Sequence, residues 1–313
     1  MTIRLILNGK AAGEPDLREA VESLRHGGVR LEVRVTWEGG DAIRFIEEAH
    51  RDGIERIIIG GGDGSLHEAV NGLMKLERDQ RPALGIVPMG TANDFARSAD
   101  IPLEPLEALS LAVHGEPQWV DVGCLNDVFF LNMASGGFGA KVTASTPPGL
   151  KKVLGGSAYS LVGAMRAWRF QPFDGHLIFA DATQACSLIV LAIGNGRQAG
   201  GGQELTSRAR INDGLLDVMA VESFHFSDIG QAVREMENLA VDGRFVRYCQ
   251  TSWVRFEGER ELPVNLDGEE YHFETAGFRC MASELPLILT PECPLLNDPP
   301  ADSDEQSPRV LKR

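Results

Sequence analysis

The feature that most constrains the fold is a β-branched run that passes through a glycine-rich loop into a helical pattern. Residues 54–59 predict a buried strand, residues 60–64 read Gly-Gly-Gly-Asp-Gly, and residues 65–76 carry apolar side chains at helical spacing. Glycines let the backbone approach a ligand closely and adopt positive φ, and a helix N-terminus offers free N–H groups at the positive end of its dipole. The segment predicts a phosphate-binding loop. The alternative is a tight turn, although such turns rarely need four glycines in five residues.

Strands and helices alternate through the first third of the chain. Strand patterns lie at 3–7, 31–35, 54–59 and 83–87, and helical patterns at 15–25, 41–49, 65–76 and 105–113. This alternation is typical of a layered α/β domain with a largely parallel sheet. We assign it to residues 1–118.

The pattern changes near Trp119 to strands with few helices. Two apolar runs flank Asn126-Asp127, which is a hairpin signal. Further strand patterns lie at 176–180, 186–193, 215–221, 251–257, 262–266 and 285–289, and helical patterns at 151–169 and 228–241. We expect a second, mostly antiparallel β-sandwich-like domain over 119–296. Residues 297–313 are rich in Pro, Asp and Ser and predict a disordered tail.

The charge balance narrows the class of partner. The 313-residue chain has 30 Lys and Arg against 45 Asp and Glu, a formal net charge of −15. Nucleic-acid binding needs basic surfaces, so that role is not expected, and any membrane contact should be transient. The sequence shows neither a signal-peptide core nor a long apolar span, which predicts a cytoplasmic protein. Five widely spaced cysteines predict reduced thiols rather than a zinc site.

The glycine loop matches neither of two common nucleotide-binding patterns. The P-loop pattern is absent, and G-x-G-x-x-G fails because its last glycine would fall at Ser65 or His67. An acidic residue beside phosphates is costly unless a metal or a proton transfer requires it. Asp63 therefore suggests a metal–nucleotide complex.

A second loop, residues 88–95, follows the next predicted strand. In a parallel sheet it lies at the same carboxyl edge as the glycine loop, where ligands bind in open α/β sheets. Thr91 would donate its hydroxyl to a phosphate, and Asn93 or Asp94 would hold the loop. The alternative is a simple helix cap at Thr91 or Asn93. Thr36, just after the second strand, points to the same edge.

Several motifs, taken in order, resemble one family. GGGDGSLHE (60–68) and PMGTANDFA (88–96) resemble the diacylglycerol kinase catalytic-domain family of lipid kinases, and the full set resembles its YegS-like bacterial branch. The remaining motifs are VTWEGGDA (35–42), SGGFG (135–139), GNGRQAGGG (194–202), INDGLLDV (211–218) and NLDGE (265–269). The resemblance runs from about Leu5 to Leu296. It implies a nucleotide domain, a β-sandwich-like domain, and an active site in the cleft between them.

The resemblance also implies roles for individual residues. The ATP contacts fall on Thr36, Gly62, Asp63, Gly64, Ser65, Leu66, His67, Glu68 and Thr91. Ser65 replaces the family's usual Thr and keeps its hydroxyl, and His67 stands where relatives carry Asn. Glu269 matches the family's base, and a carboxylate within reach of a hydroxyl suits that task. Asp267 and Asp63 are alternative bases or metal ligands, and Asp267-Gly268 is alternatively a plain hairpin turn.

A structural cation is implied at INDGLLDV. By resemblance, the Asp213 carboxylate and the main-chain carbonyls of Arg210 and Leu215 hold Mg2+, with Ca2+ as the alternative. The Arg210 side chain would weaken cation binding unless it points away. Arg197 is either a phosphate contact or a solvent-exposed arginine. The helix at 151–169 is either a lipid-facing surface or part of the core.

The sequence thus favours an ATP-dependent lipid kinase that uses Mg2+. Its acceptor is a lipid hydroxyl, on a phospholipid head group such as phosphatidylglycerol or on a diacylglycerol-like lipid. One alternative is an NAD kinase-like enzyme, against which the joint presence of GTANDFA, INDGLL and NLDGE argues. Another is a noncatalytic nucleotide- or lipid-binding regulator, against which the intact Asp63, Asp213 and Glu269 argue. The oligomeric state is left open.

Overall fold

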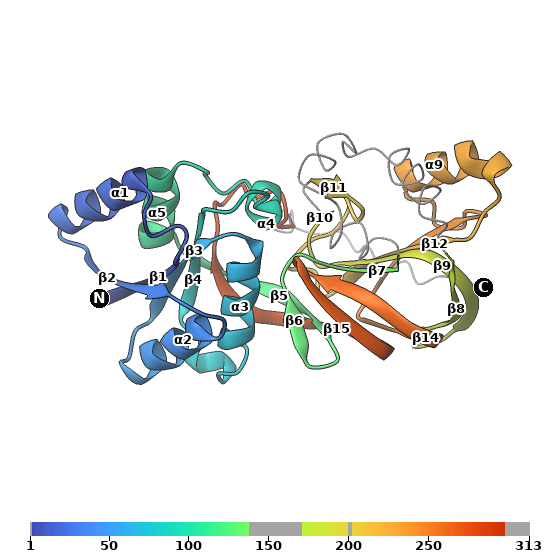
Figure 1. The fold of residues 1–313 in the computed structure, drawn as a ribbon, viewed down its shortest axis with the longest axis horizontal. Helices are drawn as coiled ribbons and strands as arrows, with labels where there is room; N and C mark the ends of the chain where they lie inside the picture. Colours follow the sequence, from blue (N-terminus) through green and yellow to red (C-terminus); the bar gives the residue numbers. More distant parts are fainter. Residues whose placement is uncertain (1, 138–170, 200–201, 298–313) are drawn as a thin grey trace, which may run out of the picture.

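The computed structural model describes residues 2–137, 171–199 and 202–297 (Figure 1). An α/β half and a β-rich half lie side by side and share one 13-stranded sheet. The fold class expected from the sequence is confirmed. The predicted helix at 151–169 and all of the predicted tail except Asn297 lie outside the described residues.

Four parallel strands form the sheet of the first half, in the order β4-β3-β1-β2. They are β1 (Thr2–Asn8), β2 (Arg30–Thr36), β3 (Arg56–Gly61) and β4 (Ala83–Pro88). Buried side chains of α2 (Asp41–Arg51) and α3 (Asp63–Leu73) share one core cluster, and those of α1 (Pro15–His26) and α5 (Pro105–His114) share another. Two apolar cores are thus packed against this sheet.

Two local differences from the sequence prediction concern the ligand edge. Helix α3 begins at Asp63 rather than Ser65, so this acidic residue lies in the first helical turn instead of within the loop. A short helix, α4 (Asp94–Ser98), follows the second loop and was not predicted, and a 3-10 turn, η1 (Arg78–Gln80), precedes β4. Five residues give too short a periodicity to identify such a helix from sequence.

The second half is antiparallel, as predicted. Its sheet order is β13-β12-β9-β7-β14-β15, with β5, β6 and β8 paired alongside. The strands are β5 (Pro117–Leu125), β6 (Val128–Phe130), β7 (Met133–Gly137), β8 (Phe173–Ile178), β9 (Thr183–Gly194), β12 (Leu216–Glu222), β13 (Val246–Thr251), β14 (Trp253–Leu266) and β15 (Glu269–Ile288). A small β10 (Gln198–Ala199) and β11 (Gln203–Glu204) pair, a 3-10 turn η2 (Phe226–Asp228) and helix α9 (Ile229–Glu237) complete it. The hairpin expected at Asn126-Asp127 joins β5 to β6.

Strand β15 connects the two halves. It spans 20 residues, pairs with β14 and β5, and lies parallel to β4 at the pair Leu287–Leu84. Leu285, Leu287 and Leu289 are buried in the core cluster that also contains α2 and α3. The end of β15 and the residue just beyond it therefore support the first half, and a domain boundary at residue 118 stays a prediction.

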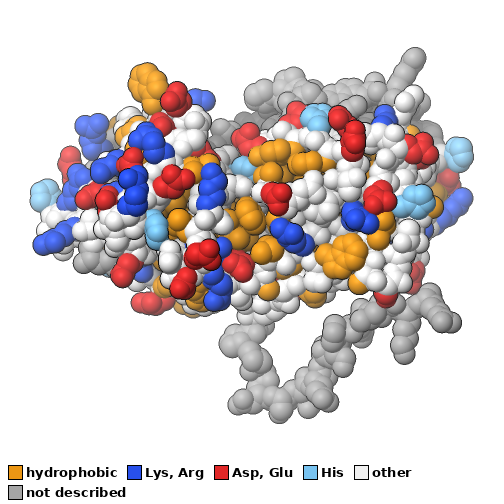
Figure 2. All heavy atoms as spheres, turned by 90° about the horizontal axis from the view of Figure 1, so that it is seen from below, with side chains coloured by type: hydrophobic (Ala, Val, Ile, Leu, Met, Phe, Trp, Pro, Cys, Tyr) orange, Lys and Arg blue, Asp and Glu red, His pale blue; other side chains and the backbone are white. Residues whose placement is uncertain are grey.

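Charged side chains of both signs are spread over the surface. On the face shown in Figure 2, basic and acidic side chains interleave over the first half, and hydrophobic side chains gather toward the second half. A continuous basic surface, which nucleic-acid binding requires, is not visible on this face. Within the described residues, no helix is long and apolar enough to cross a bilayer.

Candidate active site

The ends of the parallel strands bring the two predicted ligand loops together. Asn8 is in register with Thr36, and Gly61 is in register with Pro88, so these residues share the carboxyl edge of the sheet. The Met89 N–H donates to the Gly61 carbonyl at 2.8 Å. The two loops also approach so closely that a Cβ on Gly62 would lie 3.0 Å from the Gly90 Cα. The glycine loop and the loop carrying Thr91 therefore form one continuous surface.

Close packing, rather than positive φ, explains the glycines of the loop. The expectation of positive φ is wrong, because Gly60, Gly61, Gly62 and Gly64 are not among the positive-φ glycines, and Gly62 has φ −96°. A Cβ on Gly61 would collide with the Ser65 side chain. A Cβ on Gly64 would lie 2.9 Å from the Glu269 Oε1. The loop backbone thus lies directly under the neighbouring side chains, at the N-terminus of α3.

Asp63 lies at this N-terminus in an unfavourable electrostatic environment for a carboxylate. Burial, together with the nearby charges of Asp94 and Asp267, raises the pKa of Asp63 from 3.8 to about 6. The Phe95 N–H donates to its Oδ1 at 3.4 Å, which offsets part of this effect. A carboxylate whose ionised form is disfavoured by burial and by acidic neighbours is suited to bind a cation or to exchange a proton.

Asp267 forms a tight turn and binds the backbone opposite. Asp267 and Gly268 have φ values of 49° and 108°, and Leu266 pairs with Glu269, which confirms the hairpin prediction. The Asp267 Oδ2 accepts from the Leu131 N–H at 2.7 Å, and its Oδ1 accepts from the N–H groups of Asn132 at 3.0 Å and Met133 at 2.8 Å. With both oxygens engaged, this carboxylate stabilises the turn and is poorly placed to act as a base.

The same turn sets the position of Glu269. Glu269 begins β15 and is exposed, and its Oε1 lies against Gly64 at the start of α3. A carboxylate from the second half is thereby brought to the predicted phosphate-binding loop of the first half. Glu269 and the glycine loop, which the family resemblance assigns to a common cleft, are thus adjacent in the structure.

His67 and Asn71 connect the halves rather than the ligand edge. The His67 side chain is buried, its Nε2 lies 3.1 Å from the Tyr271 hydroxyl, and its Nδ1 lies 3.9 Å from the Asp267 Oδ2. The Asn71 amide donates to the Phe129 carbonyl at 2.8 Å and accepts from the Phe129 N–H at 3.0 Å. These contacts fix α3 against the second half. Sequence reasoning missed Tyr271 and Asn71.

The other predicted nucleotide contacts separate into buried and accessible side chains. Leu66 is buried in the core, so only its backbone faces the loop. The Glu68 Oε1 accepts from the N–H groups of Gly40 at 2.7 Å and Ala42 at 3.2 Å, and thereby holds the loop after β2. Thr36 is partly exposed and Thr91 is exposed. Sequence reasoning missed Asn8. The available signal was its position as a polar residue at the end of an apolar strand, at this edge of the sheet.

Ser65 retains a polar contact that is compatible with its predicted role. The Asn8 amide donates to the Ser65 Oγ at 3.1 Å. The hydroxyl that replaces the family's usual Thr is therefore held at the loop, between β1 and α3. The loop carrying Thr91 is also braced, because Asn93 bonds both the N–H and the carbonyl of Gly90.

The predicted cation site offers one carboxylate. Burial, with Asp217 and Asp121 nearby, raises the pKa of Asp213 to about 6, and its Oδ1 accepts from the Leu215 N–H at 3.0 Å. The Arg210 guanidinium points to the carbonyls of Pro294 and Leu296, so it does not occupy the Asp213 carboxylate. Among the residues that the structure describes, no group of three or more His, Cys, Asp or Glu side chains is arranged to hold a metal.

Neither prediction for Arg197 describes its contacts. Its Nε donates to the Ala209 carbonyl at 3.1 Å, and its Nη2 donates to the Pro294 carbonyl at 2.7 Å. Arg197 therefore ties the glycine-rich segment around residue 196 to the C-terminal end of the described chain. These bonds favour a structural role for this arginine over a phosphate contact.

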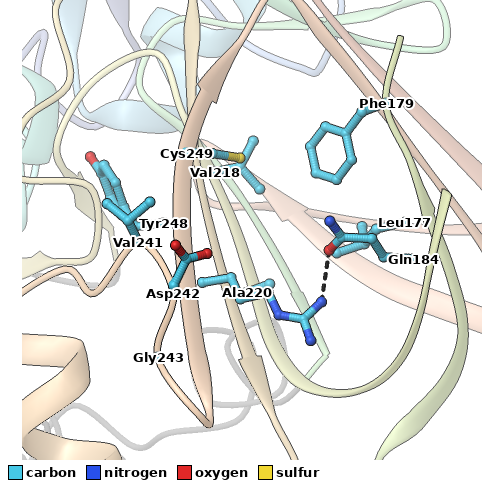
Figure 3. Close-up of a pocket in the computed structure, with 11 residues that line it drawn as sticks. Leu177, Phe179, Gln184, Val218, Ala220, Val241, Asp242, Gly243, Tyr248 and Cys249 are labelled. Carbon is cyan, nitrogen blue, oxygen red and sulfur yellow. Dashed lines mark hydrogen bonds between the residues drawn. The ribbon is translucent and has the colours of Figure 1, made fainter. Parts of the chain in front are cut away.

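A pocket of about 410 Å³ lies in the second half, between β8, β12 and β13 (Figure 3). Its apolar lining includes Leu177, Phe179, Val218 and Cys249. At its polar side an arginine, Arg247, donates to the Gln184 Oε1 at 2.7 Å, the dashed contact in Figure 3. None of the predicted site residues lines this pocket.

Comparison with known proteins agrees with the arrangement of motifs. Residues 2–125 match the diacylglycerol kinase catalytic domain, and residues 132–289 match the YegS C-terminal NAD kinase beta sandwich-like domain. A relative from Chromohalobacter salexigens named "Probable lipid kinase YegS-like" is 54% identical over 266 residues, covering 85% of this chain and 86% of the relative. The chain belongs to this family of YegS-like lipid kinases. A relative of the same name from Shewanella frigidimarina is 42% identical and covers 94% of this chain and 96% of its own.

Solved structures share the fold of these kinases. A crystal structure from Bacillus anthracis strain Sterne superposes with a TM-score of 0.77 at 26% identity, over 93% of this chain and 98% of that chain. A second, titled as a diacylglycerol kinase from the same strain, has a TM-score of 0.71 at 23% identity over the same shares. The two-half architecture is thus common to all three chains.

Proposed function

We propose that this protein transfers the γ-phosphoryl group of ATP to a hydroxyl group of a membrane lipid, with Glu269 as the general base. The observation that carries the proposal is the contact of the Glu269 Oε1 with Gly64 at the start of α3. A base and a phosphate-binding helix terminus are thereby adjacent, and phosphoryl transfer depends mainly on such positioning.

Each group has a defined task in this reaction. The loop from Gly62 to Glu68 holds the phosphates of ATP through backbone N–H groups at the N-terminus of α3. Thr91 and Thr36 offer hydroxyl groups at the same edge. Glu269 accepts the proton as the O–H bond of the lipid breaks, the lipid oxygen bonds to the γ-phosphorus, and the bond from that phosphorus to the leaving oxygen of ADP breaks.

The acidic residues at the site fit a divalent cation. The raised pKa of Asp63 reflects a buried carboxylate with acidic neighbours, and a cation would relieve this repulsion. Asp63 is therefore the residue that would hold Mg2+ arriving with ATP. When bound, Mg2+ would neutralise part of the negative charge on the phosphates. Asp213 with the carbonyls of Arg210 and Leu215 would hold a separate structural Mg2+ or Ca2+, since hard cations take oxygen ligands.

The acceptor is either a phospholipid head group, such as phosphatidylglycerol, or a diacylglycerol-like lipid, because both present the same nucleophile. We place the reaction in the cytoplasm, where ATP is supplied, with transient contact at the membrane. The acidic net charge of −15 favours brief visits over stable docking on anionic lipid.

The deciding experiment is transfer of labelled phosphate from ATP, with Mg2+, into a mixed bacterial lipid extract resolved by chromatography. One labelled lipid with the wild type and none with Glu269→Gln is the expected result. General-base removal should lower turnover by roughly 10²- to 10⁴-fold, while binding of ATP stays close to that of the wild type. Glu270→Gln is the matched control, because Glu270 is the next residue along β15 and is also exposed.

Two outcomes would contradict the proposal. Near-normal transfer by Glu269→Gln would remove Glu269 as the base and promote Asp63. ATP binding without any labelled lipid would favour NAD as the acceptor, which is the next substrate to assay, or a noncatalytic regulator.

A further inference from the structure

One aromatic side chain at the ligand edge is almost fully exposed. Trp37 has 94% of its surface exposed, whereas the other large apolar side chains exposed in the described part range from 36% for Trp253 to 50% for Leu106. Leaving a side chain of this size in water forgoes the favourable free energy of burying its apolar surface. An exposed tryptophan of this kind is more readily explained by a ligand than by the fold of the chain alone.

The backbone around Trp37 is held in place. The Asp41 Oδ2 accepts from the N–H groups of Trp37 at 2.7 Å and Glu38 at 3.2 Å, and the Arg44 guanidinium binds the other oxygen of Asp41. The Glu68 Oε1 holds Gly40 on the far side of the same loop. The ring is therefore presented to solvent from a fixed loop rather than from a free one, and this loop is bonded directly to α3.

The location of Trp37 fits one end of a nucleotide. It follows Thr36, the last residue of β2, and β2 is the edge strand of the sheet. Figure 1 shows β2 on the side of the sheet away from the second half. The glycine loop follows β3, which is separated from β2 by β1 alone. With strands about 4.8 Å apart, the two loops are roughly 10 Å from each other, comparable to the span between the phosphates and the base of a nucleoside triphosphate.

The direction of the nucleotide follows from Glu269. This carboxylate comes from the second half and meets α3 at Gly64, so it marks the side from which the acceptor approaches the terminal phosphate. The nucleoside must then extend the other way along the edge, past Thr36 toward Trp37. A flat apolar face near Trp37 is enough to bind the base, because every base has a face that stacks on aromatic rings.

We propose that the indole ring of Trp37 stacks on the base of the nucleotide co-substrate. This inference rests on the proposed kinase function, and it adds a binding residue that contacts the base rather than the phosphates. Stacking of a base on an aromatic ring is lost on substitution by alanine. Because Trp37 makes its contact in the ground state and the transition state alike, its removal should raise KM and leave kcat unchanged.

The test compares Trp37→Ala, Trp37→Phe and the control Trp253→Ala. Binding of ADP by calorimetry should weaken roughly 5- to 50-fold in Trp37→Ala and little in Trp37→Phe, which keeps a stacking ring. Binding of tripolyphosphate, which lacks a base, should be the same in all variants. ADP should also quench a fluorescence component that is present in the wild type and absent in Trp37→Phe.

Failures of the two proposals are distinguishable. If the wild type binds no adenine nucleotide, the proposed function fails. If the wild type binds ADP and Trp37→Ala binds it equally well, only the stacking inference is overturned. Loss of sedimentation with phosphatidylglycerol vesicles by Trp37→Ala, with unchanged ADP binding, would instead assign Trp37 to a membrane surface.

Discussion

The carboxylate of Glu269 occupies the space beside Gly64 that any larger residue would need, since a Cβ there would approach the Glu269 Oε1 to 2.9 Å. This contact joins the first turn of α3 to the start of β15, two elements that are about two hundred residues apart in sequence. A larger residue at position 64 would therefore displace the proposed base without removing it.

Gly64→Ala should therefore impair the reaction with little effect on the fold. Its Cβ meets the end of a flexible, exposed side chain, so the carboxylate is displaced at small cost in stability. We expect kcat to fall by at least about 10-fold, because small misplacements of a reacting group have large effects on rate. Labelled-phosphate transfer and thermal unfolding measure the two effects. Gly60→Ala is the contrasting variant: its Cβ would meet the Leu7 side chain at 2.5 Å in the core, so it should lower stability instead. An unchanged kcat in Gly64→Ala would argue against the position of the base.

The raised pKa of Asp63 predicts a pH-dependent stability for the protein without ligand. The pKa of Asp63 is about 6 in the folded protein against 3.8 ordinarily, so between these values the folded state binds more protons than the unfolded state. The free energy of unfolding should then fall as pH rises through this window, by roughly 3 kcal/mol. Asp63→Asn should abolish this pH-dependent part of the free energy of unfolding. Asp127→Asn removes an exposed carboxylate in the β5–β6 turn and should leave the pH dependence unchanged. Urea unfolding at several pH values measures the difference. Parallel profiles for wild type and Asp63→Asn would contradict the prediction.

Periodicity identified the elements that build the ligand edge, because β1 to β4 are apolar runs and their helices carry clear apolar faces. It did not identify β13 or the first four fifths of β15. Residues 269–284 are rich in charge and contain only two fully buried side chains, Ala276 and Phe278, so their apolar pattern is too weak to identify a strand. Pairing with β14 and β5, together with the burial of Ala276 and Phe278 in the core of the second half, stabilises this segment.

The residues of the candidate site also form two groups. Some were indicated by short sequence motifs, and others are recognised only from tertiary contacts. Short motifs singled out Asp63, Thr91 and Glu269 as candidates, because each lies in a segment of characteristic residue types. The contact of His67 with Tyr271 joins positions 204 residues apart, and no short pattern reports such a pair. Likewise, Glu68 and Leu66 belong to the loop motif by sequence, yet their side chains stabilise a neighbouring loop and the core. Only tertiary structure shows which members of a motif face the ligand.

Asp267 should prove to be a stabilising residue rather than the base. Its side chain is 5% exposed, and it accepts hydrogen bonds from three backbone N–H groups between the end of β6 and the start of β7. Asp267→Ala would leave these donors without their acceptor, at a cost of about 3 kcal/mol. Thermal and urea unfolding measure this loss, with Asp127→Ala as the control in an exposed turn. A variant at position 267 that is fully stable and yet inactive would instead support direct participation in proton transfer.

The final prediction concerns the cation site at Asp213. A metal that binds only the folded protein stabilises it, by about 2.7 kcal/mol at a concentration of 100 times Kd. Titration with Mg2+ or Ca2+ should therefore raise the melting temperature of the wild type, and Asp213→Ala should remove most of this increase because the carboxylate is the charged ligand. Arg210→Leu is the discriminating control. Since the proposed ligand at position 210 is a main-chain carbonyl and the guanidinium is bonded to Pro294 and Leu296, this variant should keep its metal response while losing stability. Equal responses in wild type and Asp213→Ala would reject Asp213 as a ligand of this cation.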